Sequence, residues 1–248
     1  MPWHLSAYIN SNFNVTLSDS VALMDGIMTI QNGHFLPNLQ MNLYGGWFGG
    51  ANLSRAYLYT PRTRQVVPPA MVPIQRSLLP PDRPHILDRR RQPIILNAVE
   101  EVQILMNIGG TVAGPNWSIL LWGPSMEAAP TGEIYTLHGT SVTPAIPQTW
   151  TQIQPVYEQN LPAGTYALVG SQLQSPNQIA HRFTFKDQVQ RPGFTSVIDV
   201  ANISEPSYYN GGWGTLGRFN TYTLPNIEVL CNAADAIHDI YLNIIRVA

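Results

Sequence analysis

The chain has 248 residues, of which 44% are hydrophobic, and a formal net charge of −2. A hydrophobic fraction of this size supplies a folded core and excludes a disordered chain. Only 11% of the residues are charged, against roughly 25% in ordinary globular domains. Because a monomer needs surface charge to stay soluble and unassociated, the composition predicts that much of the surface is covered, most simply by other copies of the chain.

The few charges are unevenly distributed. Residues 55–91 hold eight arginines and two aspartates, whereas residues 92–248 hold five basic and eleven acidic side chains. All basic residues except Lys186 are arginines. This suits an interface, and a compositional bias such as a GC-rich genome explains it equally well. The basic segment is predicted to pair with the acidic body of a neighbouring copy or with phosphate. The alternative is a solvated, arginine-rich loop.

Strand-like pieces open the chain, at residues 4–9, 26–30, 41–44 and 56–59, and residues 18–24 are compatible with a helical turn. The first residues lack a basic segment followed by an apolar core, so no signal peptide is expected. No apolar run reaches the length of a membrane span. We therefore expect folding in a cytoplasm. Residues 45–50 place Trp47 and Phe48 between two glycine pairs, which is typical of a flexible loop.

Residues 61–93 hold eight prolines and most of the arginines. Proline removes backbone donors and favours extended conformations, so this segment is predicted to be an arm or linker rather than a packed element. Its arginines are the predicted contacts to a neighbour or to an anionic interior: Arg83, Arg89, Arg90 and Arg91. The predicted domain organisation is an irregular β region over 1–60, the arm over 61–93 and a β-sandwich over 94–248.

The second half reads as a series of short strands. Val102, Ile104, Met106 and Ile108 alternate with polar residues, which is the period of a half-buried strand. Further strands are predicted at 117–122, 134–141, 149–157, 165–172, 181–186, 219–223, 227–231 and 240–247, and a second helical turn at 232–238. Strands of this number and spacing favour an all-β, antiparallel sandwich of the jelly-roll or Greek-key type.

One turn in this half has a recognisable pattern. Leu161, Gly164 and Tyr166 fit L-x-x-G-x-Y, the tyrosine corner of Greek-key proteins, in which the tyrosine hydroxyl bonds to the backbone a few residues upstream. The alternative is a plain hairpin turn with a core tyrosine. Cys231, the single cysteine, lies in an apolar run and is expected to be a buried, inert thiol.

The patterns that imitate catalytic sites lack the context that their chemistry needs. Residues 212–217 fit G-x-G-x-x-G, but no strand precedes them and no helix follows, so nucleotide binding is not expected. Asp235, His238 and Asp239 form a compact acid–histidine group, compatible with metal binding or proton transfer, or simply with a polar connection. Glu100 and Glu101 are adjacent, so on a strand they point to opposite faces. We predict no enzyme, cofactor or metal site.

Aromatic residues in glycine- and asparagine-rich segments form the other candidate site: Trp47, Phe48, Tyr208, Tyr209 and Trp213. Such residues serve as anchors in protein interfaces. On a β-sandwich they also stack on sugar rings, so the alternative function is a lectin-like or receptor-binding module. The low charge and the arm favour the interface.

Together, the short-stranded β body with Leu161–Tyr166, the Arg/Pro segment 55–91, the glycine–aromatic loops and the terminal apolar strand resemble the jelly-roll capsid proteins of tailless icosahedral bacteriophages. The resemblance is a general one that extends over the whole length, and it assigns no function to individual residues. It implies a virion protein that assembles in many copies through sandwich edges and arms. Other virion proteins, a genome or an internal membrane are further implied partners.

Overall fold

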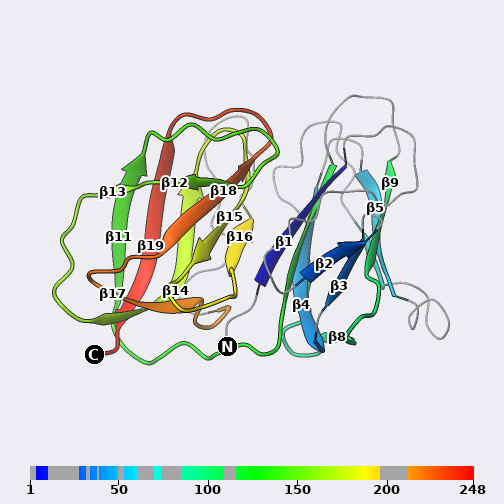
Figure 1. The fold of residues 1–248 in the computed structure, drawn as a ribbon, viewed down its shortest axis with the longest axis horizontal. Helices are drawn as coiled ribbons and strands as arrows, with labels where there is room; N and C mark the ends of the chain where they lie inside the picture. The colour runs from blue at the N-terminus through cyan, green and yellow to red at the C-terminus, as the bar shows by residue number, and fades with distance from the viewer. Residues whose placement is uncertain are drawn as a thin grey trace. The chain divides into compact units, whose positions relative to one another are not determined.

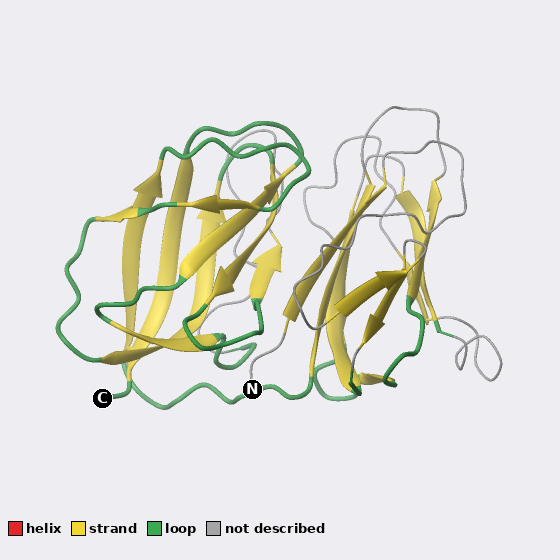
Figure 2. Cartoon of the chain, in the orientation of Figure 1, coloured by secondary structure: helices red, strands yellow, loops and turns green. Residues whose placement is uncertain are grey.

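The computed structural model of the chain describes residues 4–10, 28–31, 34–37, 39–49, 53–60, 70–73, 85–108, 116–195 and 212–248. These residues form strands, turns and loops, and none of them is helical (Figure 2). Nor does a helix long and apolar enough to cross a membrane occur in this part of the chain. The chain divides into two compact units, unit 1 (Met1–Leu5 and Ser125–Ala248) and unit 2 (Ser6–Pro124). The predicted all-β, antiparallel fold is confirmed.

Unit 1 consists of two antiparallel sheets (Figure 1). The five-stranded sheet has the order β13-β11-β19-β14-β17, and the four-stranded sheet has the order β12-β18-β15-β16. The strands are β11 (Ile134–Ser141), β12 (Thr151–Ile153), β13 (Val156–Tyr157), β14 (Thr165–Gln174), β15 (Gln178–Thr184), β16 (Gly193–Thr195), β17 (Gly217–Asn220), β18 (Asn226–Cys231) and β19 (His238–Arg246). Apart from β15 and β16, neighbours in these two sheets are not consecutive along the chain, so most connections cross between strands that are distant in sequence.

Alternation along β19 shows how the sequence makes this sandwich. Ile240, Leu242 and Ile244 are buried, whereas Asp239, Tyr241 and Asn243 between them are partly exposed. One face of the strand therefore contributes to the core and the other lies towards solvent.

At two positions of unit 1, glycine allows a close approach that a side chain would prevent. A Cβ atom on Gly217 would lie 2.5 Å from the Phe185 ring, so β17 needs glycine there to approach this ring. Gly214 has a φ of +77°, and a Cβ atom on it would lie 2.1 Å from the backbone oxygen of Glu127. Glycine is required at this second position by both conformation and space.

Most strands predicted in this half recur with shifts of a few residues, and residues 134–141 form a strand with the predicted bounds. The strand predicted at 149–157 is instead two short strands, β12 and β13, in different sheets, and β16 was not predicted. The predicted helical turn at residues 232–238 is wrong, because residues 232–237 form the bends and loop between β18 and β19, and His238 begins β19. The Asp235 carboxylate instead accepts hydrogen bonds from the backbone nitrogen and the side-chain amide of Asn177, each at 2.7 Å. These bonds stabilise a non-helical connection.

Unit 2 contains the remaining sheets, ordered β1-β10-β4-β7 with β8 also paired to β4, β6-β5-β9 and β2-β3. Their strands are β1 (His4–Asn10), β2 (Met28–Gln31), β3 (His34–Pro37), β4 (Met41–Gly49), β5 (Leu53–Tyr59), β6 (Ala70–Pro73), β7 (His85–Asp88), β8 (Ile94–Leu96), β9 (Gln103–Ile108) and β10 (Asn116–Gly123). Strand β1 starts in unit 1, where the Leu5 nitrogen donates to the Arg191 oxygen at 2.9 Å, and continues into unit 2.

Two expectations for the first half need correction. Residues 45–49 of the glycine–aromatic segment are not a loop, because they belong to β4, which pairs with β10 and β7. The segment 61–93 is not an extended arm throughout, because β6 and β7 within it pair with β5 and β4. Glycine and proline mark breaks in isolated sequences, but here neighbouring strands satisfy the backbone groups. Among the described strands, β4 is paired on both sides, whereas β6 and β7 end their sheets, where proline is tolerated.

The predicted segments 1–60, 61–93 and 94–248 also differ from the two units. Strands β8, β9 and β10 follow residue 93 in the chain, but they pair with β4 and β5. Whether the chain folds as separate domains with the predicted bounds stays a prediction.

Candidate functional site

A turn between β13 and β14 forms one wall of a surface groove in unit 1. The Tyr166 hydroxyl donates to the Pro162 oxygen at 2.8 Å, four residues upstream. This is the hydrogen bond that the L-x-x-G-x-Y pattern predicts. Thr221 donates to the same oxygen at 3.0 Å, and the Arg246 guanidinium donates to the Ala163 oxygen at 2.9 Å. The wall is therefore held by side chains from three other segments.

A groove of about 330 Å³ lies against this wall, and we call it the corner groove. Its lining combines the buried side chains Leu137, Tyr166 and Ile244 with the wall and with the rim residues Tyr135 and Arg246. Tyr135 is 49% exposed, and its hydroxyl donates to Glu133 at 3.0 Å. Since pockets for small molecules typically measure roughly 300–1,000 Å³, the corner groove has room for a few side chains.

A second pocket of about 290 Å³ shares Leu137 and residues 159–161 with the corner groove. Tyr157, Thr221 and Leu224 complete its lining. The Tyr157 hydroxyl is buried and has no hydrogen-bond partner among the described residues. Burial also raises the pKa of this hydroxyl, so it stays protonated and is a donor without an acceptor.

The exposed face of the five-stranded sheet carries an ionic cluster centred on His138. Its Nδ1 lies 2.9 Å from Glu158 Oε2 and its Nε2 lies 2.6 Å from Asp239 Oδ1. The Tyr241 ring stacks on the imidazole at 4.5 Å between centroids, and its hydroxyl donates to Asp239. The hydrogen bonds to Glu158 and then to Asp239 raise the pKa of His138. Each carboxylate lies against a different ring nitrogen, so the three groups do not converge on one point as the ligands of a metal ion would.

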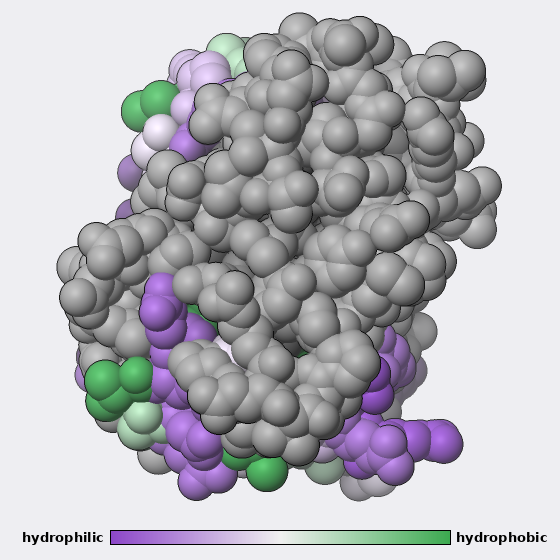
Figure 3. All heavy atoms as spheres, turned by 90° about the vertical axis from the view of Figure 1, so that its right-hand side faces the viewer, coloured by the Kyte–Doolittle hydropathy of each residue, from purple (hydrophilic) through white to green (hydrophobic). Residues whose placement is uncertain are grey.

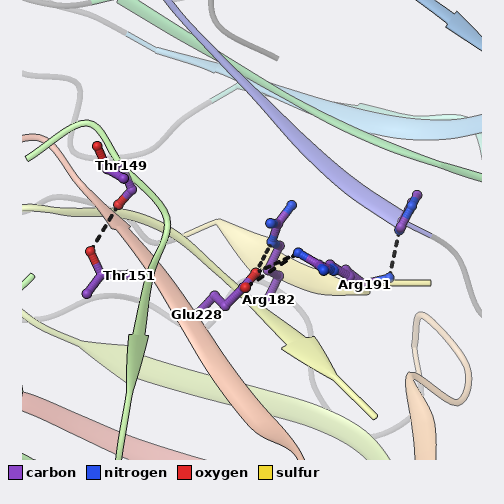
Figure 4. A network of polar contacts seen from close by, with 6 residues as sticks. Thr149, Thr151, Arg182, Arg191 and Glu228 are labelled. Carbon is purple, nitrogen blue, oxygen red and sulfur yellow. Dashed lines mark hydrogen bonds and ion pairs between the residues drawn. The ribbon is translucent and has the colours of Figure 1, made fainter. Parts of the chain in front are cut away.

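A second network ties the four-stranded sheet to the start of the chain (Figure 4). Arg182 Nε donates to Glu228 Oε2 at 2.5 Å, and Arg191 Nη1 lies 3.4 Å from Glu228 Oε1. The Arg191 backbone nitrogen donates to His4 Nδ1 at 2.6 Å. The Arg182 guanidinium also lies 4.2 Å from the centroid of the Trp150 ring. Paired, stacked and almost fully buried, this arginine is a structural residue.

His181 lies inside the sandwich with Ser171 and Gln178. Ser171 Oγ is 2.7 Å from Nε2, and the Gln178 side-chain nitrogen is 3.1 Å from Nδ1. These distances would suit an activated serine. All three residues are buried, however, and burial lowers the pKa of His181 to about 3. A base this weak, out of reach of a substrate, does not form a nucleophilic site.

The predicted acid–histidine group is dispersed in the structure. Asp235 bonds Asn177, Asp239 pairs with His138, and His238 Nε2 lies 3.1 Å from the Thr143 oxygen. The prediction of a compact group is wrong because alternation along β19 sends His238 inwards and Asp239 outwards. Among the described residues, no three His, Cys, Asp or Glu side chains lie close enough together to hold a metal ion.

The other imitations of catalytic motifs also have structural explanations. Residues 212–217 form a turn, an isolated bridge at Thr215 and the start of β17, without the helix that a dinucleotide needs. Glu100 accepts a hydrogen bond from the Asn97 backbone nitrogen at 3.0 Å and so closes a turn. Cys231 is a buried free thiol whose pKa burial raises to about 12, with a further contribution from Asp235.

The predicted arginine contacts are distributed differently from a uniform basic patch. Arg90 makes a short ion pair with Asp88, with Nη2 and Oδ2 2.6 Å apart, and this pairing lowers the pKa of the aspartate. The Arg89 side chain is half-buried, and Arg91 is exposed. Arg83 lies outside the described residues. A contact of any of these arginines with a neighbour stays a prediction.

The predicted loop aromatics do not form one site. Trp213 lies in a turn but is only 1% exposed, so its predicted role as an exposed contact is wrong. Trp47 and Phe48 lie on strand β4 rather than in a loop. Tyr208 and Tyr209 lie outside the described residues. The turn buries Trp213 because Gly214, at positive φ, brings the chain against the backbone of Glu127.

Sequence reasoning missed the corner groove and the His138 cluster. Both combine β11 and β19, whose sequences lie about a hundred residues apart. The tyrosine-corner pattern was the one available signal for the groove, since it places the wall. No local signal paired His138 with Asp239.

No known protein family matches the chain, and no curated protein matches it. Among solved structures the chain is similar to the major capsid protein P2 from bacteriophage PM2, with 9% sequence identity, 98% of each chain covered and a TM-score of 0.26. A TM-score this low carries no argument about fold or function. The fold rests on the strand pairing described above.

Proposed function

We propose that the chain is a structural protein that assembles with copies of itself into a shell of the viral capsid type. The observation that carries the proposal is a group of exposed aliphatic side chains at one end of unit 1, which we call the apex patch. It consists of Val142, Ile146 and Ile237, exposed by 79%, 59% and 66%. Large aliphatic side chains exposed together mark interaction sites more often than free surface.

The apex patch is built on two ordered loops. The Ala145 nitrogen donates to the Asp235 oxygen at 2.7 Å, and the Gln148 nitrogen donates to the Cys231 oxygen at 2.7 Å. These bonds join the loop after β11 to the loop before β19. A rigid apolar surface loses little conformational entropy on binding, so it favours a permanent interface.

Strand edges provide a second means of association. In the described part of unit 1, β13 and β17 end the five-stranded sheet, while β12 and β16 end the four-stranded sheet. Each is two to four residues long, and Val156 on β13 is 75% exposed. Short edges resist indiscriminate pairing but accept a neighbour held in place by other contacts.

The distribution of charge along the chain also favours a second copy of the chain as the partner. In the proposal, the basic segment 55–91 of one copy faces the acidic residues of another, with Arg91 as the exposed contact among the described arginines. On the face drawn in Figure 3, the described residues are a mixture of hydrophilic and single hydrophobic ones. The protein would be made in the host cytoplasm and would reside in the virion, with other virion proteins, a genome or a membrane as further partners.

Light scattering and negative-stain microscopy of the purified chain test the proposal. We expect multimers or particles whose fraction rises with concentration. Replacing Val142 and Ile237 with serine should weaken association about a hundredfold or more, since each buried aliphatic side chain contributes roughly 1.5–3 kcal/mol. Val189→Ser, at an exposed valine in another loop of unit 1, is the matched control. A strictly monomeric protein at high concentration would overturn the proposal.

The lectin-like alternative has no specific observation in its favour. Of its aromatic residues, Trp213 is buried and Trp47 lies on a strand. The structural role is therefore the one we propose, without catalysis.

A further inference from the structure

We propose that the corner groove and the pocket beside it bind the proline-rich segment around Leu78–Pro81 of a second copy of the chain. This inference rests on the proposed self-assembly and names one of its contacts. The groove and the neighbouring pocket share the wall residues 159–161, so together they form two adjoining depressions, the groove mainly apolar and the pocket of mixed polar and apolar lining. Each has the volume of a few side chains, which suits an extended peptide better than a compact ligand.

The lining has the chemistry that recognises proline-rich peptides. Tyr135, Tyr157 and Tyr166 supply aromatic rings, and Leu161 and Pro162 supply aliphatic surface. Polyproline-type helices dock in aromatic-lined grooves of this kind because their conformation is already fixed before binding. Such a peptide keeps its backbone carbonyls free, because its backbone makes no internal hydrogen bonds.

The buried hydroxyl of Tyr157 is a donor that fits those carbonyls. The hydroxyl has no acceptor among the described residues, and other atoms of the Tyr157 side chain line the second pocket. A buried donor without an acceptor costs free energy, which a bound carbonyl would recover. The wall is rigid enough to present the site, because Tyr166, Thr221 and Arg246 all bond it.

Charge complementarity selects the occupant. Glu133, which accepts a hydrogen bond from the rim residue Tyr135, places an acid at the rim of the groove, and Arg246 lines the groove itself. In the segment, Arg76 and Arg83 flank Leu78–Pro81, and Asp82 lies between them. Each charge of the site therefore has an opposite charge available in the segment.

The other proline-rich stretch is a poorer candidate. It includes residues 70–73, which form β6 and pair with β5 inside unit 2. Residues 74–84 join β6 to β7 and lie outside the described part of the chain. The sequence of this connection, rather than its conformation, makes it the proposed ligand.

Peptide binding to the full chain tests the site. A chain with Leu79→Ser and Pro80→Ser leaves the groove available, and a synthetic peptide of residues 74–85 is titrated into it by calorimetry. We expect saturable binding that Tyr135→Ser weakens about tenfold and Tyr157→Phe weakens less. Tyr222→Ser, at an 87% exposed tyrosine that does not line the groove, should leave binding unchanged. A peptide with Pro80 and Pro81 replaced by alanine should not bind, and equal binding of both peptides would overturn the proposal.

Cross-linking between two populations tests the source of the segment. One population carries Asn160→Cys at the groove, the other carries Ser77→Cys and a size tag, and a short bismaleimide joins the two thiols. A mixed dimer is expected. If a doubly substituted chain cross-links only within itself, the segment binds in its own copy and the proposal of a second copy is wrong. Absence of any cross-link likewise overturns it.

The two proposals can fail separately. Particles that form normally while the peptide does not bind would remove the groove contact and leave the shell function standing. Peptide binding and mixed dimers without any larger assembly would support the groove contact and remove the shell function.

Discussion

Two regions of unit 1, the interior of the sandwich and the outer face of one sheet, shift the pKa of a histidine in opposite directions. Inside the sandwich, His181 is buried between Ser171 and Gln178, without a carboxylate bonded to it among the described residues, and burial lowers its pKa to about 3. On the outer face of the five-stranded sheet, His138 lies between Glu158 and Asp239, which raise its pKa. The interior therefore stabilises the neutral imidazole of His181, and the surface cluster stabilises the charged imidazole of His138.

The two histidines separate two causes of a pKa shift, burial in the interior and pairing with carboxylates. A buried polar group is stable only with its partners present, because water cannot replace them. A surface cluster loses less when a partner is removed, because water and salt screen the remaining charges. The interior should therefore show large effects of mutation and acid, and the surface cluster small effects of opposite pH dependence.

The largest effect is expected from the buried ion pair of Arg182. Glu228→Gln leaves the arginine charged and buried without its carboxylate, so the free energy of unfolding should fall by about 3–5 kcal/mol. Glu127→Gln is the matched control, since Glu127 pairs with Arg218 on the surface and should cost less than about 1 kcal/mol. Urea denaturation of both variants measures the difference. Equal losses would show that the interior is not the more demanding region.

Acid should destabilise the fold through His181. The unfolded ring takes up a proton below about pH 6.5, whereas the folded ring resists protonation down to about pH 3. Stability should therefore decrease as the pH falls through this window, by about 1.4 kcal/mol per pH unit at most. His181→Gln should reduce this slope in denaturation curves measured between pH 4 and 7. An unchanged slope in the variant would assign the acid sensitivity to other groups.

Ser171→Ala tests the hydrogen bond to the buried imidazole. The substitution removes the partner of Nε2, which lies 2.7 Å away, and should lower the free energy of unfolding by about 1–3 kcal/mol. Ser141→Ala is a useful control, because Ser141 is also a buried strand serine and its hydroxyl bonds the partly exposed Thr143. A loss no greater than that of the control would mean that the imidazole does not depend on Ser171.

The smallest effect is expected from the surface cluster. His138→Gln should cost about 1 kcal/mol or less. The sign of its pH dependence is opposite to that of His181, because the contribution of a raised pKa is present in full below about pH 6.5 and is lost as the pH rises through the folded pKa. Thermal denaturation at pH 5.5 and pH 8.5 should therefore separate the variant from the parent chain more at pH 5.5. A larger difference at pH 8.5 would contradict the assigned charge state.

The sequence by itself determined the fold class, most strands of the second half and the tyrosine corner. Alternation such as that in β19 is a local property, and burial of one face follows from it directly. The spacing of Leu161, Gly164 and Tyr166 is equally local, and the Tyr166–Pro162 hydrogen bond spans only four residues. Signals of this kind lie within one turn or one strand, so they can be read without knowing the neighbours.

Tertiary structure alone decided which distant residues meet. It separated Asp239 from His238 and paired it with His138, 101 residues away. It buried Trp213, took Trp47 and Phe48 into a strand, and placed β6 and β7 of the predicted arm in sheets. It also formed the corner groove from β11, β19 and the corner turn. The physical reason is that strand pairing uses backbone hydrogen bonds, which are the same for every residue type, so the partner of a strand is decided by the packing of whole sheets.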